Sequence, residues 1–209
     1  AWKYPNGIRH YSQIFQDRHR KRWEIGDWTD DTDMMLCIAD AVIEDKGVDF
    51  YNIARHFKEW ANGEPMGIGE NTYKVLMMGD YVERPFEVSH KVWEMSRYQS
   101  AANGGLMRTS VVGLFPKEVK TCAENICRLT HYDPRCVGSC VIVSELIHAL
   151  VYGLEPPTMS MMLNMAQSYD AEICNYIERS WSEQNVLNLM DDDHMGYTLV
   201  TLSVALWAY

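Results

Sequence analysis

The chain has 209 residues, of which 47% are hydrophobic and 23% are charged, so it holds enough apolar material for the core of one domain. This composition argues against an intrinsically disordered chain, which has few apolar residues and a high charge content. The 19 basic and 29 acidic residues leave a formal net charge of −10, which repels phosphate backbones and disfavours nucleic acid as a partner.

Apolar residues at helical spacing predict a first helix over 32–45, which Gly47 ends. Asp49 is suited to cap the next helix, and that helix carries apolar residues on one face, namely Phe50, Ile53, Ala54, Phe57 and Trp60. A short helix is expected over 72–78. Pro85 can open a fourth helix, because a proline in the first turn loses no intrahelical hydrogen bond.

The second half of the chain continues in the same way. Pro116 suits the first turn of a fifth helix, and Asp133-Pro134 forms an N-cap followed by a proline at the first helical position. That helix reaches Gly153, and further helical segments are expected over 158–181 and 196–209. Since no segment alternates polar and apolar residues over the length of a strand, the sequence predicts an all-α domain of about eight or nine helices.

The six cysteines are scattered and form no Cys-x-x-Cys pair, which favours reduced thiols that pack as small buried hydrophobes. No secretory signal opens the chain. Its most apolar stretch, 195–209, is shorter than the roughly 20 residues that cross a bilayer. We therefore expect a cytoplasmic protein without a membrane partner.

Three consecutive oxygen-bearing side chains, Thr29, Asp30 and Asp31, stand immediately before an apolar helix. Magnesium takes oxygen ligands in near-octahedral geometry, and the start of a helix holds neighbouring side chains in a fixed fan that suits it. The helix dipole disfavours a cation there, so the carboxylates must outweigh about half a positive charge. Ordinary helix capping by Thr and Asp explains the same residues, and the spacing alone leaves both interpretations open.

A second motif, residues 100–108, reads Ser-Ala-Ala-Asn-Gly-Gly-Leu-Met-Arg. Gly104 and Gly105 let the backbone approach a ligand closely, and successive amides can form a nest for a diphosphate. Asn103 is suited to bind a ribose hydroxyl. The alternative is an ordinary turn between two helices.

His131 stands between the expected end of one helix and the cap of the next, where it can point into a crevice between them. The alternative is a histidine that pairs with the carboxyl end of a helix. The basic cluster 18–22 and the acidic run 191–194 are interpreted as solvated surface.

Four motifs in this order resemble the signatures of the ADP-ribosylglycohydrolase family. They are Gly-Asp-x-Thr-Asp-Asp-Thr from Gly26, Asn-Gly-Gly-x-Met-Arg from Asn103, Thr-His-x-Asp-Pro from Thr130, and Gly-Tyr-x-x-x-Thr-Leu-x-x-Ala-Leu-Trp from Gly196. The resemblance runs from residue 26 to the end of the chain. Each motif is moderately specific, and four in the right order are a strong signal.

The resemblance implies an orthogonal all-α bundle with a cleft for two magnesium ions, or manganese in some members. It implies an enzyme that removes ADP-ribose from modified protein side chains or related ADP-ribosyl conjugates. It assigns metal binding to Thr29, Asp30 and Asp31, and the two aspartates are also the catalytic candidates. It assigns ADP-ribose binding to a larger set, namely Ser100, Asn103, Gly104, Gly105, Met107, His131 and Tyr197.

The family's acidic motif near the carboxyl end, Gly-Gly-Asp-x-Asp-Thr, and its amino-terminal helix have no match in this sequence. We therefore expect residues 1–209 to form a single domain that is incomplete at both termini and slow in turnover. Uncovered apolar surface is then expected around Leu202, Val204, Leu206 and Trp207. Two other functions stay open, a non-catalytic ADP-ribose-binding module and a crystallin-like structural protein on the same fold.

Overall fold

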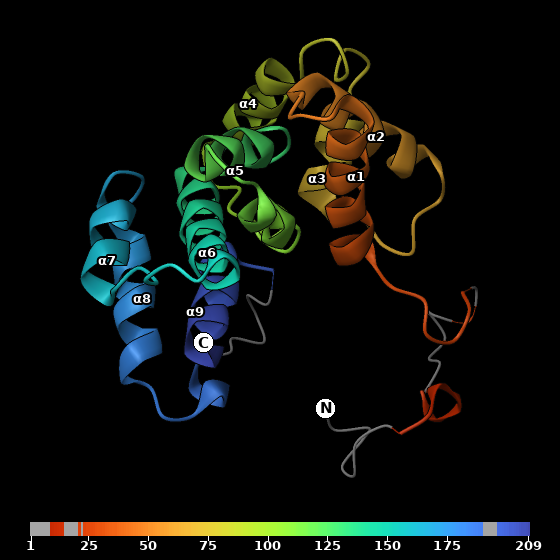
Figure 1. The fold of residues 1–209 in the computed structure, drawn as a ribbon. Coiled ribbons are helices and arrows are strands. Elements are labelled where there is room, and N and C mark those ends of the chain that lie inside the picture. Colours follow the sequence, from red (N-terminus) through yellow and green to blue (C-terminus); the bar gives the residue numbers. More distant parts are fainter. Residues whose placement is uncertain (1–8, 15–20, 22, 190–195) are drawn as a thin grey trace.

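The computed structural model describes residues 9–14, 21, 23–189 and 196–209, and within them the chain forms nine α-helices (Figure 1). In chain order these are α1 (Asp30–Asp45), α2 (Phe50–Asn62), α3 (Glu70–Leu76), α4 (Pro85–Met95), α5 (Val119–Arg128), α6 (Pro134–Tyr152), α7 (Met159–Gln167), α8 (Glu172–Ser182) and α9 (Thr198–Ala208). The described residues contain no strand, only one isolated bridge between Ala102 and Tyr197. The predicted all-α fold class is confirmed.

Side-chain caps set several helix boundaries where the sequence predicted them. The Asp49 carboxylate accepts hydrogen bonds from two amides in the first turn of α2, and Asp133 accepts one from the amide of Arg135 at the start of α6. Gly153 ends α6 with a φ of 65°, a left-handed conformation that glycine adopts without a Cβ penalty. These caps are local signals, which explains why the sequence revealed them.

Two predicted boundaries are wrong. Pro116 lies outside α5, because Glu118 adopts a left-handed φ of 58° and the helix begins only after it. A 3-10 helix, η3 (Thr109–Leu114), precedes this turn. The segment 158–181 is two helices, α7 and α8, since the Asp170 carboxylate accepts the amide of Glu172 and starts a new helix there.

The core consists of two clusters of buried side chains, one on each side of α6. Residues of α1–α5 and η3 build most of the first cluster, and residues of α6–α9 build most of the second. In Figure 1, α7 and α8 lie on one side of α6 and α1–α3 on the other, and α9 packs against α6 itself. Among the described helices, α6 alone is long and apolar enough to cross a membrane, and 56% of that apolar window is buried within this fold.

The last helix is better covered than expected. Leu202 and Leu206 are 0% and 4% exposed, because α9 packs against α6 and α8. The expectation of uncovered apolar surface is therefore wrong for these two leucines. Trp207 does stay at the surface, with 37% of its area exposed.

Candidate active site

The start of α1 holds the three predicted metal ligands. Thr29 occupies the N-cap position in extended backbone, but its hydroxyl caps no amide and instead donates to Oδ2 of Asp31 at 2.8 Å. Asp30 is half-buried, and its burial, followed by the negative charge of Asp31, raises the pKa of its carboxyl group. Simple helix capping therefore does not account for Thr29.

The donor atoms of these side chains are of the type that a hard cation binds, but they are too few to hold one alone. They present only oxygen donors, the ligand type that Mg²⁺ takes, and a cation would relieve the repulsion between Asp30 and Asp31. Within the described part of the chain, no group of three or more His, Cys, Asp and Glu side chains is gathered so that it could hold a metal ion. Thr29, Asp30 and Asp31 thus offer suitable oxygen donors, but the described residues do not gather a complete set of metal ligands around them.

Asp33, which no sequence motif indicated, ties the start of α1 to two tryptophans. Its Oδ1 accepts from the indole N–H of Trp28 at 2.7 Å, and its Oδ2 accepts from that of Trp60 at 2.9 Å. These bonds join the segment before α1, the first turn of α1 and the end of α2. Asp30 faces the α2–α3 connection, where its Oδ1 lies 3.7 Å from the Cβ position of Gly67.

The predicted ligand loop, residues 100–108, is fastened at its base to the start of α9. The amide of Asn103 donates to the carbonyl of Gly196 at 2.8 Å, and the amide of Thr198 donates to the carbonyl of Ala101 at 2.9 Å. The side chain of Asn103 donates through Nδ2 to Oγ1 of Thr201 at 3.2 Å. The ligand loop and the motif that begins at Gly196, which are distant in sequence, therefore meet here. Asn103 joins them with its backbone amide and with one proton of its side-chain amide.

Both glycines of the loop pack against buried side chains. A Cβ on Gly104 would lie 2.8 Å from Cε1 and 3.0 Å from Nε2 of His131, and one on Gly105 would lie 2.9 Å from Sγ of Cys127. Real Cβ contacts are longer than this, so neither position has room for a side chain. The glycine pair brings the loop backbone directly onto the end of α5.

His131 lies beneath this loop and is only 1% exposed. Its Nδ1 is 2.8 Å from Oγ1 of Thr130, whereas Nε2 is buried without a hydrogen-bond partner among the described residues. Burial, and then the positive charge of Arg108, lower the pKa of the imidazole to about 3, so the ring is neutral near pH 7. The histidine therefore supports the loop from below, and it is not open to solvent.

Arg108, at the end of the loop, links these parts to α1. Its guanidinium is fully buried, donates to Oγ1 of Thr130 at 2.7 Å and to the carbonyl of Ile126 at 3.1 Å, and lies 4.4 Å from the ring centre of Phe57. It also contacts Sδ of Met34 at 3.5 Å, one turn beyond Asp30. The loop and His131 are thus in direct contact, and the start of α1 joins them through Met34 and Arg108.

Asn71, in the first turn of α3, is a site residue that no sequence motif indicated. Its Oδ1 accepts from the hydroxyl of Ser100 at 2.8 Å, and its Nδ2 donates to the carbonyl of Thr130 at 2.9 Å. Asn71 and Ser100 also line a pocket of about 300 Å³ whose apolar wall comes from α3 and α4 and their flanks, including Met78, Val92 and Met95. The pocket borders the ligand loop.

Of the predicted site residues, all of which the structure describes, Ser100 alone lines this pocket. Tyr197 lies beside the loop, and Met107 belongs to it. Tyr197 pairs with Ala102 through the isolated bridge, but its hydroxyl donates to Glu172 at 2.8 Å and accepts from Arg135 at 3.3 Å. Met107 is half-buried and packs against the first core cluster.

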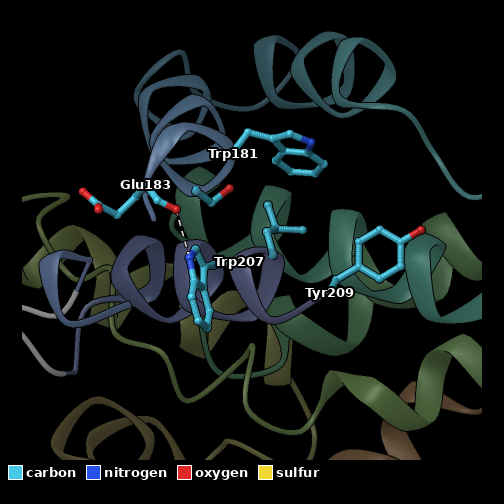
Figure 2. Close-up of a pocket in the computed structure, with 6 residues that line it drawn as sticks. Trp181, Glu183, Trp207 and Tyr209 are labelled. Atoms are coloured by element: carbon cyan, nitrogen blue, oxygen red, sulfur yellow. Dashed lines mark hydrogen bonds between the residues drawn. The ribbon is translucent and has the colours of Figure 1, made fainter. Parts of the chain in front are cut away.

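A separate pocket of about 360 Å³ lies between α8 and α9 and contains none of the predicted metal-binding or ADP-ribose-binding residues (Figure 2). Trp181 and Tyr209 help to line it, and the indole N–H of Trp207 donates to the carbonyl of Glu183 at 3.0 Å. The acidic run 191–194 lies outside the described residues, as does the basic cluster 18–22 apart from Lys21.

Comparison with known proteins agrees with these motifs. The family model for ADP-ribosylglycohydrolase matches residues 1–209. The chain is 24% identical over 211 residues to the ADP-ribosylarginine hydrolase Tri1 of Serratia proteamaculans, which covers 90% of this chain and 51% of that protein. It is also 24% identical over 210 residues to the Tri1 protein of Pseudomonas putida, covering 90% and 50%. The chain therefore spans about half the length of these curated relatives.

A solved structure described as an ADP-ribosylglycohydrolase-related protein complex has the same fold. It superposes with a TM-score of 0.61 at 21% sequence identity, over 90% of this chain and 60% of that one. The expected fold type is therefore confirmed. Because the family model matches residues 1–209 of this chain, the chain belongs to the ADP-ribosylglycohydrolase family.

Proposed function

We propose that this chain supplies the ADP-ribose loop and one side of the magnesium site of a hydrolase that releases ADP-ribose from modified protein side chains or related conjugates. The observation that carries the proposal is the meeting of three separated motifs around Arg108. This residue contacts α1 through Met34, belongs to the ligand loop itself, and reaches His131 through Thr130. The names of the relatives make ADP-ribosylarginine the first substrate to test.

The reaction cleaves the bond between the anomeric carbon of ADP-ribose and the target side chain, and such cleavages pass through an oxocarbenium-like state. Bound magnesium would supply electrophilic polarisation and orientation of water, and Thr29, Asp30 and Asp31 would hold it. The amides of Gly104 and Gly105 would donate hydrogen bonds to a diphosphate, whereas the amide of Asn103 already donates to the carbonyl of Gly196. The attachment of the loop to α9 and α5 keeps the glycine amides in place before the ligand arrives.

The test measures release of free ADP-ribose by the intact protein from an ADP-ribosylated arginine peptide and from an ADP-ribosylated serine peptide. Each assay is run with magnesium, with manganese and with a chelator. We expect metal-dependent release, and a rate at least about 100-fold lower in Asp30→Asn, because a ligand of the metal is lost.

Asp40→Asn is the matched control, because it removes an exposed carboxylate from the same helix away from the site. Its rate should equal that of the unsubstituted protein. Release that continues in the chelator, or an Asp30→Asn rate equal to that of Asp40→Asn, would contradict the magnesium role. Binding of ADP-ribose without release from either peptide would instead indicate a non-catalytic binding module.

A further inference from the structure

The neighbours of the Thr130 hydroxyl determine which atom accepts its hydrogen bond. Arg108 can only donate, and its Nη2 lies 2.7 Å from Oγ1 of Thr130, so this oxygen accepts there. The other neighbour of Oγ1 is Nδ1 of His131, at 2.8 Å. Among the described residues, no second acceptor for the hydroxyl proton lies within hydrogen-bond distance. The hydroxyl of Thr130 therefore donates its hydrogen bond to Nδ1 of His131.

This direction determines where the imidazole carries its own proton. The ring is fully buried and neutral, so one nitrogen accepts and the other is protonated. If Nδ1 were protonated, the hydroxyl proton of Thr130 and the lone pair of Nε2 would both be left unpaired. With Nδ1 as acceptor, only the N–H at Nε2 lacks a partner. Since buried polar groups are nearly always paired, the second arrangement is the more stable one.

The unpaired N–H points at the ligand loop. Nε2 lies 3.0 Å from the position that a Cβ on Gly104 would occupy, and Oγ1 of Thr72 lies at the same distance from that position. Gly104 has no side chain, so its backbone comes close to this nitrogen. The buried N–H thus lies against the backbone of the ligand loop and has no partner among the described residues.

We propose that Thr130, oriented by Arg108, is a positioning residue that holds His131 in the Nε2–H tautomer and reserves this N–H for an oxygen of the bound ADP-ribosyl ligand. The inference rests on the proposed function for the identity of the ligand. It assigns Thr130 and Arg108 a role through His131 and not through direct contact. It also gives the buried N–H beneath the loop a role, since an oxygen of the ligand would accept its hydrogen bond.

The tautomer can be measured without any activity. Long-range ¹H–¹⁵N correlation spectra of ¹⁵N-histidine-labelled protein show which ring nitrogen is protonated, and His131→Asn identifies the signal among the seven histidines. We expect Nε2 to be protonated and Nδ1 to be bare at pH 7. A spectrum with protonated Nδ1 would overturn the proposal.

Two variants at position 130 separate positioning from packing. Thr130→Val keeps the shape and removes the hydroxyl, and the carbonyl of Ile126 still accepts from Arg108. Thr130→Ser keeps the hydroxyl. We expect mixed tautomers and roughly tenfold weaker ADP-ribose binding in Thr130→Val, and near-normal values within about twofold in Thr130→Ser. Binding is measured by calorimetry well below the melting temperature of both variants, so that folding losses do not enter the comparison.

The outcomes distinguish the two proposals. If ADP-ribose binds equally to both variants, the positioning role is overturned and the proposed function stands. If the unsubstituted protein binds no ADP-ribose, the proposed function fails together with the ligand assignment made here. In that case the spectrum still decides whether Thr130 sets the tautomer.

Discussion

Adding one methyl group at Gly104 tests how tightly the ligand loop is packed. The Cβ of Gly104→Ala would lie 2.8 Å from Cε1 of His131, and 3.0 Å from both its Nε2 and Oγ1 of Thr72. None of these atoms is at the free end of a mobile side chain, because His131 is 1% exposed and Thr72 is 2% exposed. The loop is also bonded at Asn103 to Gly196, so either the ring or the loop must shift against several hydrogen bonds.

The expected cost follows from these contacts. Overpacking of this kind costs about 1–3 kcal/mol, and the loss of chain entropy in the unfolded state on replacing glycine offsets about 0.4–1 kcal/mol of it. A net destabilisation of about 1–2 kcal/mol lowers the melting temperature of a chain of this size by roughly 2–8 °C. The control is Gly79→Ala, whose Cβ would meet nothing within 4 Å and whose backbone is not left-handed.

Thermal unfolding of the two variants, followed by circular dichroism, measures this difference directly. Gly104→Ala should melt below the unsubstituted protein, and Gly79→Ala should melt at or slightly above it. ADP-ribose affinity should also fall in Gly104→Ala, because the loop is displaced. Equal melting temperatures for the two alanine variants would show that the loop is not seated on His131 as described.

Two further perturbations test the neighbouring contacts. The pKa of His131 is about 3 in the folded protein and about 6.5 when unfolded, so the unfolded state binds more protons between these values and stability is lost as the pH falls through that window. From pH 7 to pH 5 this loss of stability is about 2 kcal/mol, and His131→Asn should lack it. The free energy of unfolding is measured in urea at both pH values for the two proteins. If it falls by the same amount in both, the buried ring of His131 is not neutral as described. Asp33→Asn replaces one of the two acceptors for Trp28 and Trp60 by a donor, which should cost about 1 kcal/mol and change tryptophan fluorescence, whereas Asp40→Asn should change neither. An Asp33→Asn spectrum identical to that of Asp40→Asn would refute the role of Asp33.

Local patterns in the sequence determined most of the fold. Apolar residues at helical spacing and the caps at Asp49, Asp133 and Gly153 act within one or two turns, so helix positions could be predicted without tertiary information. The errors occurred where a local choice competed with another. Glu118 turns the chain into a left-handed conformation after Pro116, and Asp170 starts a helix inside an apolar segment that reads as continuous.

The motifs determined the family and the candidate residues, because each is a short run of neighbours whose order along the chain is itself informative. Only the tertiary structure decided how those residues are used. Asn71 bridges Ser100 and Thr130, and Arg108 joins α1 to His131, through contacts between residues far apart in sequence. Hydrogen-bond direction and burial depend on which groups meet across elements, and no local pattern encodes that meeting. For the same reason the sequence could name His131 but could not reveal that its Nε2 lies beneath Gly104 with no hydrogen-bond partner in the described part of the chain.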